Sequence, residues 1–120
     1  MEKNPGPTGK SIKVFHWKLN GIETQNFVKL DMIKAYNTIH DYDIIFLSET
    51  FLDSTIKKND PNLEMQGYDL IRADHPSNTK RGGICMYYKD NLPLKERKDL
   101  LYLNESIVVE IKSKKESVFV

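Results

Sequence analysis

The segment from Asp43 to Thr50 constrains the fold more than any other part of the chain. Four large apolar residues at 44–47 follow Asp43, and Glu49 comes soon after them. An uninterrupted apolar run bounded by charge predicts a strand that is buried on both faces. Ligands and catalytic groups of α/β sheets gather outside the carboxyl ends of such strands. Glu49 is therefore a candidate oxygen ligand for a divalent cation such as Mg²⁺, and the alternative is a solvated acid that starts a loop.

Length, charge and cysteine content narrow the class of protein. A chain of 120 residues is enough for one modest domain. The net charge of +1 gives no global electrostatic reason for a nucleic-acid partner. Cys85 is the only cysteine, so the chain has no internal disulfide and no cysteine-based zinc cluster. No apolar run has the length of a membrane span or the pattern of a signal peptide, so we expect a soluble intracellular protein without a membrane partner.

The remaining pattern predicts one helix and several strands. Residues 1–10 are rich in Pro and Gly and are expected to be a linker or disordered, which leaves 11–120 as the domain. The predicted strands cover 11–19, 44–48, 67–72, 84–88, 106–111 and 117–120, and 67–72 with 84–88 form a hairpin with a long tip.

The predicted helix spans about Thr24 to Tyr42. Its apolar residues recur at helical spacing, and either Thr24 or Asn26 is a candidate N-cap. The residues that carry this spacing are Val28, Met32, Ala35, Tyr36 and Ile39. At the other end of the chain, a charged turn leads into an apolar β run that stops at Val120, and we therefore expect that the chain is cut short of its sheet.

Four segments together resemble a known family. They cover 15–22, 43–52, 67–74 and 80–88, and their order and spacing extend through nearly the whole chain. The sequence resembles the N-terminal part of an endonuclease/exonuclease/phosphatase domain, the fold of DNase I, and is most similar to the endonuclease domain of LINE-type non-LTR retrotransposons. The resemblance implies an α/β fold: a partial, truncated DNase I-like layered β-sandwich with flanking helices.

The resemblance also implies a chemistry. Enzymes of this family hydrolyse phosphodiesters or phosphomonoesters with Mg²⁺, which polarises the phosphate while a histidine–aspartate pair helps to activate water. Glu49 matches the metal-binding glutamate of the family. Intact retrotransposon relatives nick target DNA so that the exposed 3′ hydroxyl primes reverse transcription. DNA is therefore the partner that the resemblance implies, and such a role needs access to the nucleus.

Two departures from the family pattern weaken the expectation of catalysis. Lys18 stands where the family has an asparagine, and a lysine repels Mg²⁺ and competes for Glu49. Asn20 lies where some relatives have an acid that supports the metal. The later tyrosine, the aspartate/asparagine pair and the closing aspartate and histidine of the family cannot be placed before Val120. We therefore expect little or no catalysis from this chain.

The three histidines do not replace the missing groups. His16 falls in the first predicted strand and His40 ends the predicted helix, positions typical of packed or surface histidines. His75 precedes a basic loop and is a weaker candidate for a phosphate contact.

A basic, glycine-containing loop is the candidate contact to DNA. Lys80, Arg81 and the backbone amides of Gly82 and Gly83 suit phosphate oxygens, whereas the alternative is a set of solvated loop charges. On a nearly neutral chain we expect such binding to be weak and sensitive to salt. Two hypotheses follow: an inactive fragment of a Mg²⁺-dependent DNA-nicking endonuclease, or a domesticated, non-catalytic binding module.

The first residues carry a second resemblance. The segment from Glu2 to Pro7 is similar to the end of a 2A-type ribosome-skipping peptide, which occurs near the start of some retrotransposon reading frames. The upstream residues that such a peptide needs do not precede it here, so we do not expect skipping activity. Because the segment stands beside the endonuclease-like sequence, we expect that Met1 is an internal methionine of a longer ancestral frame.

Overall fold

The computed structural model of the chain describes residues 12–75, 81–98, 107, 109–112 and 117–119. The predicted linker at 1–10, Lys80 and Val120 lie outside the described residues. In chain order the elements are β1 (Val14–Lys18), α1 (Thr24–His40), β2 (Ile44–Ser48), the 3-10 helix η2 (Pro61–Leu63), β3 (Tyr68–Ala73), β4 (Ile84–Lys89), β5 (Leu94–Glu96), β6 (Val109–Lys112) and β7 (Ser117–Phe119).

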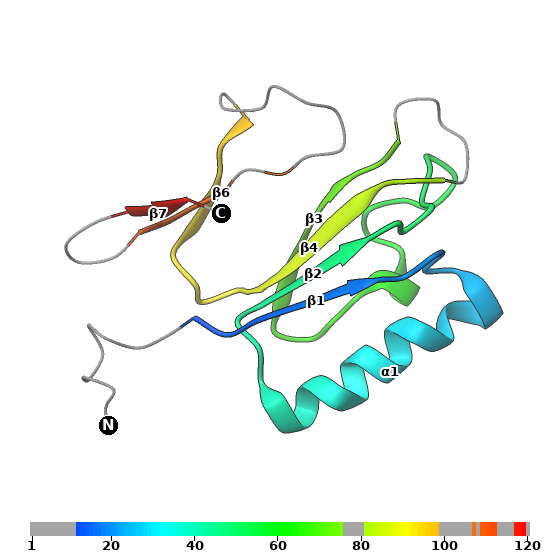
Figure 1. The fold of residues 1–120 in the computed structure, drawn as a ribbon, viewed down its shortest axis with the longest axis horizontal. Helices are drawn as coiled ribbons and strands as arrows, with labels where there is room; N and C mark the ends of the chain where they lie inside the picture. Colours follow the sequence, from blue (N-terminus) through cyan, green and yellow to red (C-terminus); the bar gives the residue numbers. More distant parts are fainter. Residues whose placement is uncertain (1–11, 76–80, 99–106, 108, 113–116, 120) are drawn as a thin grey trace.

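A mixed four-stranded sheet forms the centre of the molecule (Figure 1). Its strand order is β1-β2-β4-β3, with β1 parallel to β2 and the other neighbours antiparallel. A parallel pair needs a crossover connection, and α1 provides it between β1 and β2. The predicted hairpin of β3 and β4 is confirmed by their antiparallel register.

The core on the helix side of the sheet is formed by α1 and by side chains from one face of the sheet. Phe27, Leu30 and Ile33 are the buried residues of α1. They belong to one cluster with Ile45 and Leu47 of β2. The apolar residues whose spacing predicted the helix lie mainly on its exposed side, since Val28, Met32, Tyr36 and Ile39 are 36% to 78% exposed.

The structure of α1 differs from the sequence prediction at its first turn and defines how the helix ends. Glu23 is the N-cap and makes no side-chain capping bond, so the expectation of Thr24 or Asn26 is wrong. Residues 25–27 have left-handed dihedral angles, and the regular right-handed helix starts only after them. At the other end Asp41 adopts the left-handed conformation, and its backbone N–H donates to the carbonyl oxygen of Asn37. This turn ends the helix and leads the chain into β2.

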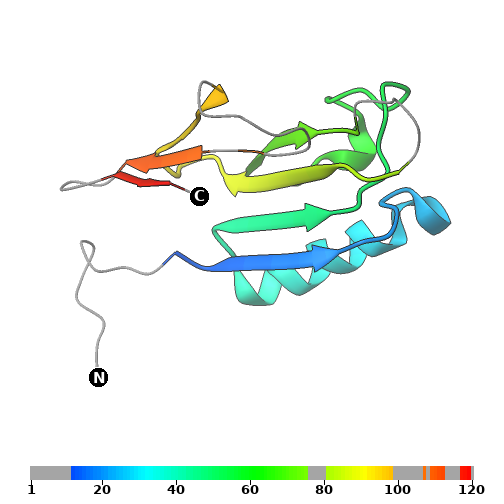
Figure 2. The ribbon, with the colours of Figure 1, turned by 45° about the horizontal axis from the view of Figure 1, so that its top comes forward.

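A second sheet and α1 lie on opposite sides of the central sheet (Figure 2). The second sheet has the antiparallel order β5-β6-β7. Ile44 of β2 and Met86 of β4 belong to one buried cluster with Val109 and Ile111 of β6. Apolar side chains from both sheets therefore share this second core. The α/β layered β-sandwich that the sequence predicted is confirmed for the described part of the chain.

The second sheet shows where the sequence pattern was least informative. The short strand β5 was not predicted, because Leu94–Glu96 contains a single apolar residue. The strand predicted at 106–111 corresponds to β6, which begins at Val109, while Ser106 and Val108 lie outside the described residues.

The two apolar sides of α1 give a direct test of its packing. Leu30 is fully buried, whereas Met32 is 56% exposed. We expect Leu30→Ala to lower the free energy of unfolding by about 2–5 kcal/mol, because it leaves a cavity under the helix. The control, Met32→Ala, changes it by less than about 0.5 kcal/mol. Urea unfolding followed by circular dichroism measures both, and equal losses would contradict the assignment of the buried side.

Candidate functional site

Glu49 lies where the sequence predicted it, directly after β2. Two hydrogen bonds between backbone groups connect this strand end to the segment that follows β1. The N–H of Leu19 donates to the carbonyl oxygen of Ser48, and the N–H of Gly21 donates to that of Glu49, each at 2.9 Å. The backbone of Glu49 is thus held beside the end of β1.

The segment that leads into β4 holds the other side of the same strand end. The N–H of Thr50 donates to the carbonyl oxygen of Gly83 at 3.2 Å, and the N–H of Phe51 donates to that of Gly82 at 2.8 Å. Gly83 has a φ of +85°, and a Cβ there would lie 2.8 Å from the hydroxyl oxygen of the buried Thr50. This close approach requires a glycine.

The backbone at the candidate site adopts unusual angles. Glu49 has a φ of 49° and Phe51 a φ of 59°, both in the left-handed region that non-glycine residues rarely adopt. Each such residue costs on the order of 1 kcal/mol and persists only where surrounding contacts fix it. The hydrogen bonds on both sides of the strand end provide those contacts.

The structure brings Lys18 and Glu49 together. The ammonium nitrogen of Lys18 lies 3.3 Å from one carboxylate oxygen of Glu49, and the two side chains are 62% and 37% exposed. Lys18 is the last residue of β1 and pairs with Ser48, the residue before Glu49. The ion pair therefore follows from the register of two neighbouring strands.

The described residues do not form a complete site for Mg²⁺. In the part of the chain that the structure describes, no group of three or more His, Cys, Asp or Glu side chains is placed to hold a metal ion. Glu49 is one carboxylate, and its ion-pair partner Lys18 carries only hydrogen-bond donors and a positive charge. Asn20 is exposed with a φ of 55°. This set of groups does not fit a divalent cation, and the roles of Glu49 and Asn20 as metal ligands stay predictions.

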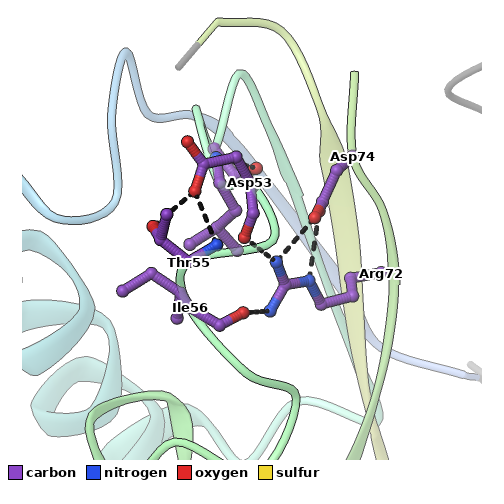
Figure 3. Close-up of polar contacts among 7 residues, drawn as sticks. Asp53, Thr55, Ile56, Arg72 and Asp74 are labelled. Atoms are coloured by element: carbon purple, nitrogen blue, oxygen red, sulfur yellow. Dashed lines mark hydrogen bonds and ion pairs between the residues drawn. The ribbon is translucent and has the colours of Figure 1, made fainter. Parts of the chain in front are cut away.

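Arg72 anchors the loop that follows Glu49, a function that the sequence did not reveal (Figure 3). Its guanidinium binds the Asp74 carboxylate through two nitrogen–oxygen contacts of 2.6 and 3.1 Å. It also donates to the carbonyl oxygens of Asp53 at 2.9 Å and Ile56 at 2.7 Å. One Asp53 carboxylate oxygen accepts from the backbone and the hydroxyl of Thr55. One largely buried cation thus holds the 53–56 loop against β3.

A local signal for this contact was present in the sequence. Asp74 directly follows β3, and side chains two apart in an extended chain lie on the same side, so Arg72 and Asp74 are placed to pair. The contacts to Asp53 and Ile56 had no such signal, because they depend on how the loop folds back onto the sheet.

Loss of the Arg72 guanidinium tests whether it holds the loop. Arg72→Met leaves the Asp74 carboxylate and two carbonyl groups without this partner, and we expect a loss of about 1.5–3 kcal/mol in the free energy of unfolding. Amide hydrogen exchange should also rise in residues 50–56. Arg81→Met, at an exposed position, serves as the control and should change the unfolding free energy by less than about 0.5 kcal/mol. Unchanged exchange in that loop would contradict the anchoring role.

The structure describes three of the four residues of the predicted DNA-contacting loop. Arg81 is exposed, and Lys80 lies outside the described residues. Gly82 and Gly83 use their carbonyl oxygens to bind the strand end at Thr50 and Phe51. The phosphate contacts of this loop stay a prediction.

The surroundings of His16, His40 and Cys85 indicate structural roles for these residues. A ring nitrogen of His16 lies 3.1 Å from the hydroxyl oxygen of Ser48. The ring of His40 packs against those of Tyr36 and Tyr42. Burial raises the pKa of the Cys85 thiol to about 12, which keeps it protonated and unsuited to act as a nucleophile.

The described ranges contain no candidate membrane-spanning helix. No helix there combines the length and the apolar character needed to cross a bilayer.

Comparisons with known proteins relate the chain to AP endonucleases by fold. No family model and no curated protein match the sequence. Among solved structures, the AP endonuclease LMAP from Leishmania major matches with a TM-score of 0.70 and 15% identity over 90% of this chain and 38% of that one. An AP endonuclease from Archaeoglobus fulgidus matches with a TM-score of 0.58 and 14% identity over 91% of this chain and 40% of that one.

A third solved structure contains DNA. The 3′ phosphatase NExo from Neisseria, bound to a product DNA hairpin, matches with a TM-score of 0.58 and 16% identity over 91% of this chain and 40% of that one. The chain thus spans about two fifths of the length of these proteins. Over that span it has the DNase I-like fold of the AP endonucleases, as the sequence predicted.

Proposed function

We propose that this chain is the N-terminal part of a Mg²⁺-dependent, DNA-nicking endonuclease domain of a non-LTR retrotransposon, and that the 120 residues alone do not hydrolyse DNA. The position of Glu49 carries the proposal. It lies at the carboxyl end of a central strand buried on both faces, in a fold shared with AP endonucleases. Open α/β sheets place their ligands at such ends.

The chemistry of Glu49 explains why the chain alone is expected to be silent. In a phosphodiesterase of this kind, a bound Mg²⁺ would stabilise the charge that develops on the phosphate. Glu49 would be only one of the ligands that such an ion needs. The tyrosine, the aspartate/asparagine pair and the closing aspartate and histidine that the family resemblance implies cannot be placed among these 120 residues, and Lys18 already binds the carboxylate of Glu49.

Contact with DNA phosphates is the part of the function that the chain retains in this proposal. Arg81 is exposed in the loop before β4, and Lys57 and Lys58 are exposed in the loop after β2. These cations suit phosphate oxygens without reading base sequence. Binding through so few charges is weak and falls steeply with salt.

One observation favours the second candidate function, a non-catalytic binding module. Lys18 neutralises the carboxylate that the family resemblance assigns to the metal, and this ion pair lies on a folded scaffold with two buried cores. A module that has lost catalysis and kept its fold would have these properties.

The transcript beyond codon 120 separates the two candidates. We expect the frame to continue and to encode the aspartate/asparagine pair and the closing aspartate and histidine, because the sheet that the family resemblance implies extends further. Sequencing of complementary DNA from the 3′ end of the message provides this measurement. A stop codon directly after Val120 would contradict the nuclease-fragment proposal and leave the binding module.

A nicking assay tests whether the 120-residue chain alone fails to hydrolyse DNA. The 120-residue protein is incubated with supercoiled plasmid and Mg²⁺, and we expect no more open circles than in buffer alone. Glu49→Gln should give the same result, because neither form completes the site. Nicking that disappears in Glu49→Gln would show that this chain is an active nuclease.

A further inference from the structure

The ion pair between β1 and β2 has a geometry fixed by the backbone. Lys18 ends β1 in register with Ser48, and the following hydrogen bonds hold Leu19 and Gly21 to the strand end that carries Glu49. Both side chains therefore start from adjoining, well-fixed positions. Their charged atoms lie 3.3 Å apart.

The ammonium group of Lys18 lies close to where a metal ion bound to Glu49 would have to lie. It lies against one carboxylate oxygen of Glu49, and a divalent cation bound to that carboxylate would have to lie within a few ångströms of it. Like charges at such a distance repel, and the repulsion doubles for a divalent ion. Asp53 and Asp74, acids of the neighbouring segments, already bind the hydroxyl of Thr55 and the guanidinium of Arg72, respectively.

We propose that Lys18 is the resident cation of Glu49 and excludes divalent metal ions from it. Glu49 is a single carboxylate whose neighbouring charge is positive, and removal of that charge opens the carboxylate to oxygen-seeking cations such as Mg²⁺ and Mn²⁺. This inference rests on the proposed function, since it takes Glu49 as the counterpart of a metal-binding glutamate.

The experiment measures Mn²⁺ binding to the 120-residue chain by the relaxation of water protons. The wild-type protein is compared with Lys18→Met, which removes the charge and adds no ligand, and with Lys18→Asn, which also supplies an amide. We expect both variants to lower the Kd for Mn²⁺ by about tenfold. Adding Glu49→Gln to either variant should return the Kd to the wild-type value.

A matched control removes the same charge elsewhere. Lys95→Met changes an exposed lysine of β5, in the second sheet, and should leave the Kd at the wild-type value. Because Lys18 is 62% exposed, its variants are expected to fold, and amide proton spectra of each protein verify this.

Three results would overturn the proposal. One is an unchanged Kd in Lys18→Met, whatever Lys18→Asn does, because charge would then not be the cause. Another is an equal change in Lys95→Met, and the third is a gain that persists with Glu49→Gln. None of these results depends on the reading frame beyond Val120 or on nicking, so failure here is distinguishable from failure of the proposed function.

Discussion

Burial of β2 on both faces is the constraint on which the rest of the structure depends. Ile45 and Leu47 belong to the core under α1, while Ile44 belongs to the core shared with the second sheet. All three are fully buried. A strand with apolar residues on both sides requires a cover on each, and the helix and the second sheet are those covers. The end of this strand then determines where Glu49 lies.

The elements that could be predicted from sequence are those with a strong local pattern. The strand at 44–48 has the predicted bounds, because a short apolar run flanked by charge has few alternatives. The helix was also predictable, but its buried side was not. Phe27, Leu30 and Ile33 form one apolar side, and residues such as Met32 and Ile39 form another, and only the sheet decides which is covered.

The parts that escaped prediction depend on contacts between segments far apart in sequence. The strand β5 exists because it pairs with β6 across more than ten residues, although its own residues are mostly polar. The guanidinium of Arg72 reaches backbone oxygens 16 and 19 residues earlier in the chain. In the candidate site, Glu49 could be identified from its place after an apolar run, and Lys18 from the family resemblance. Their approach to 3.3 Å required the register of β1 against β2.

The strained strand end explains how this fold can vary its chemistry without losing its structure. The left-handed angles of Glu49 and Phe51 are held by bonds from the backbone of both neighbouring segments, and these bonds do not involve the side chain of Glu49. The two cores consist of apolar side chains and contribute no charge to this edge. Side chains at the edge are therefore free to change while the scaffold stays the same. A lysine at the end of β1 alters the electrostatics of the neighbouring carboxylate at little structural cost, because exposed ion pairs contribute only about 0–1 kcal/mol to stability.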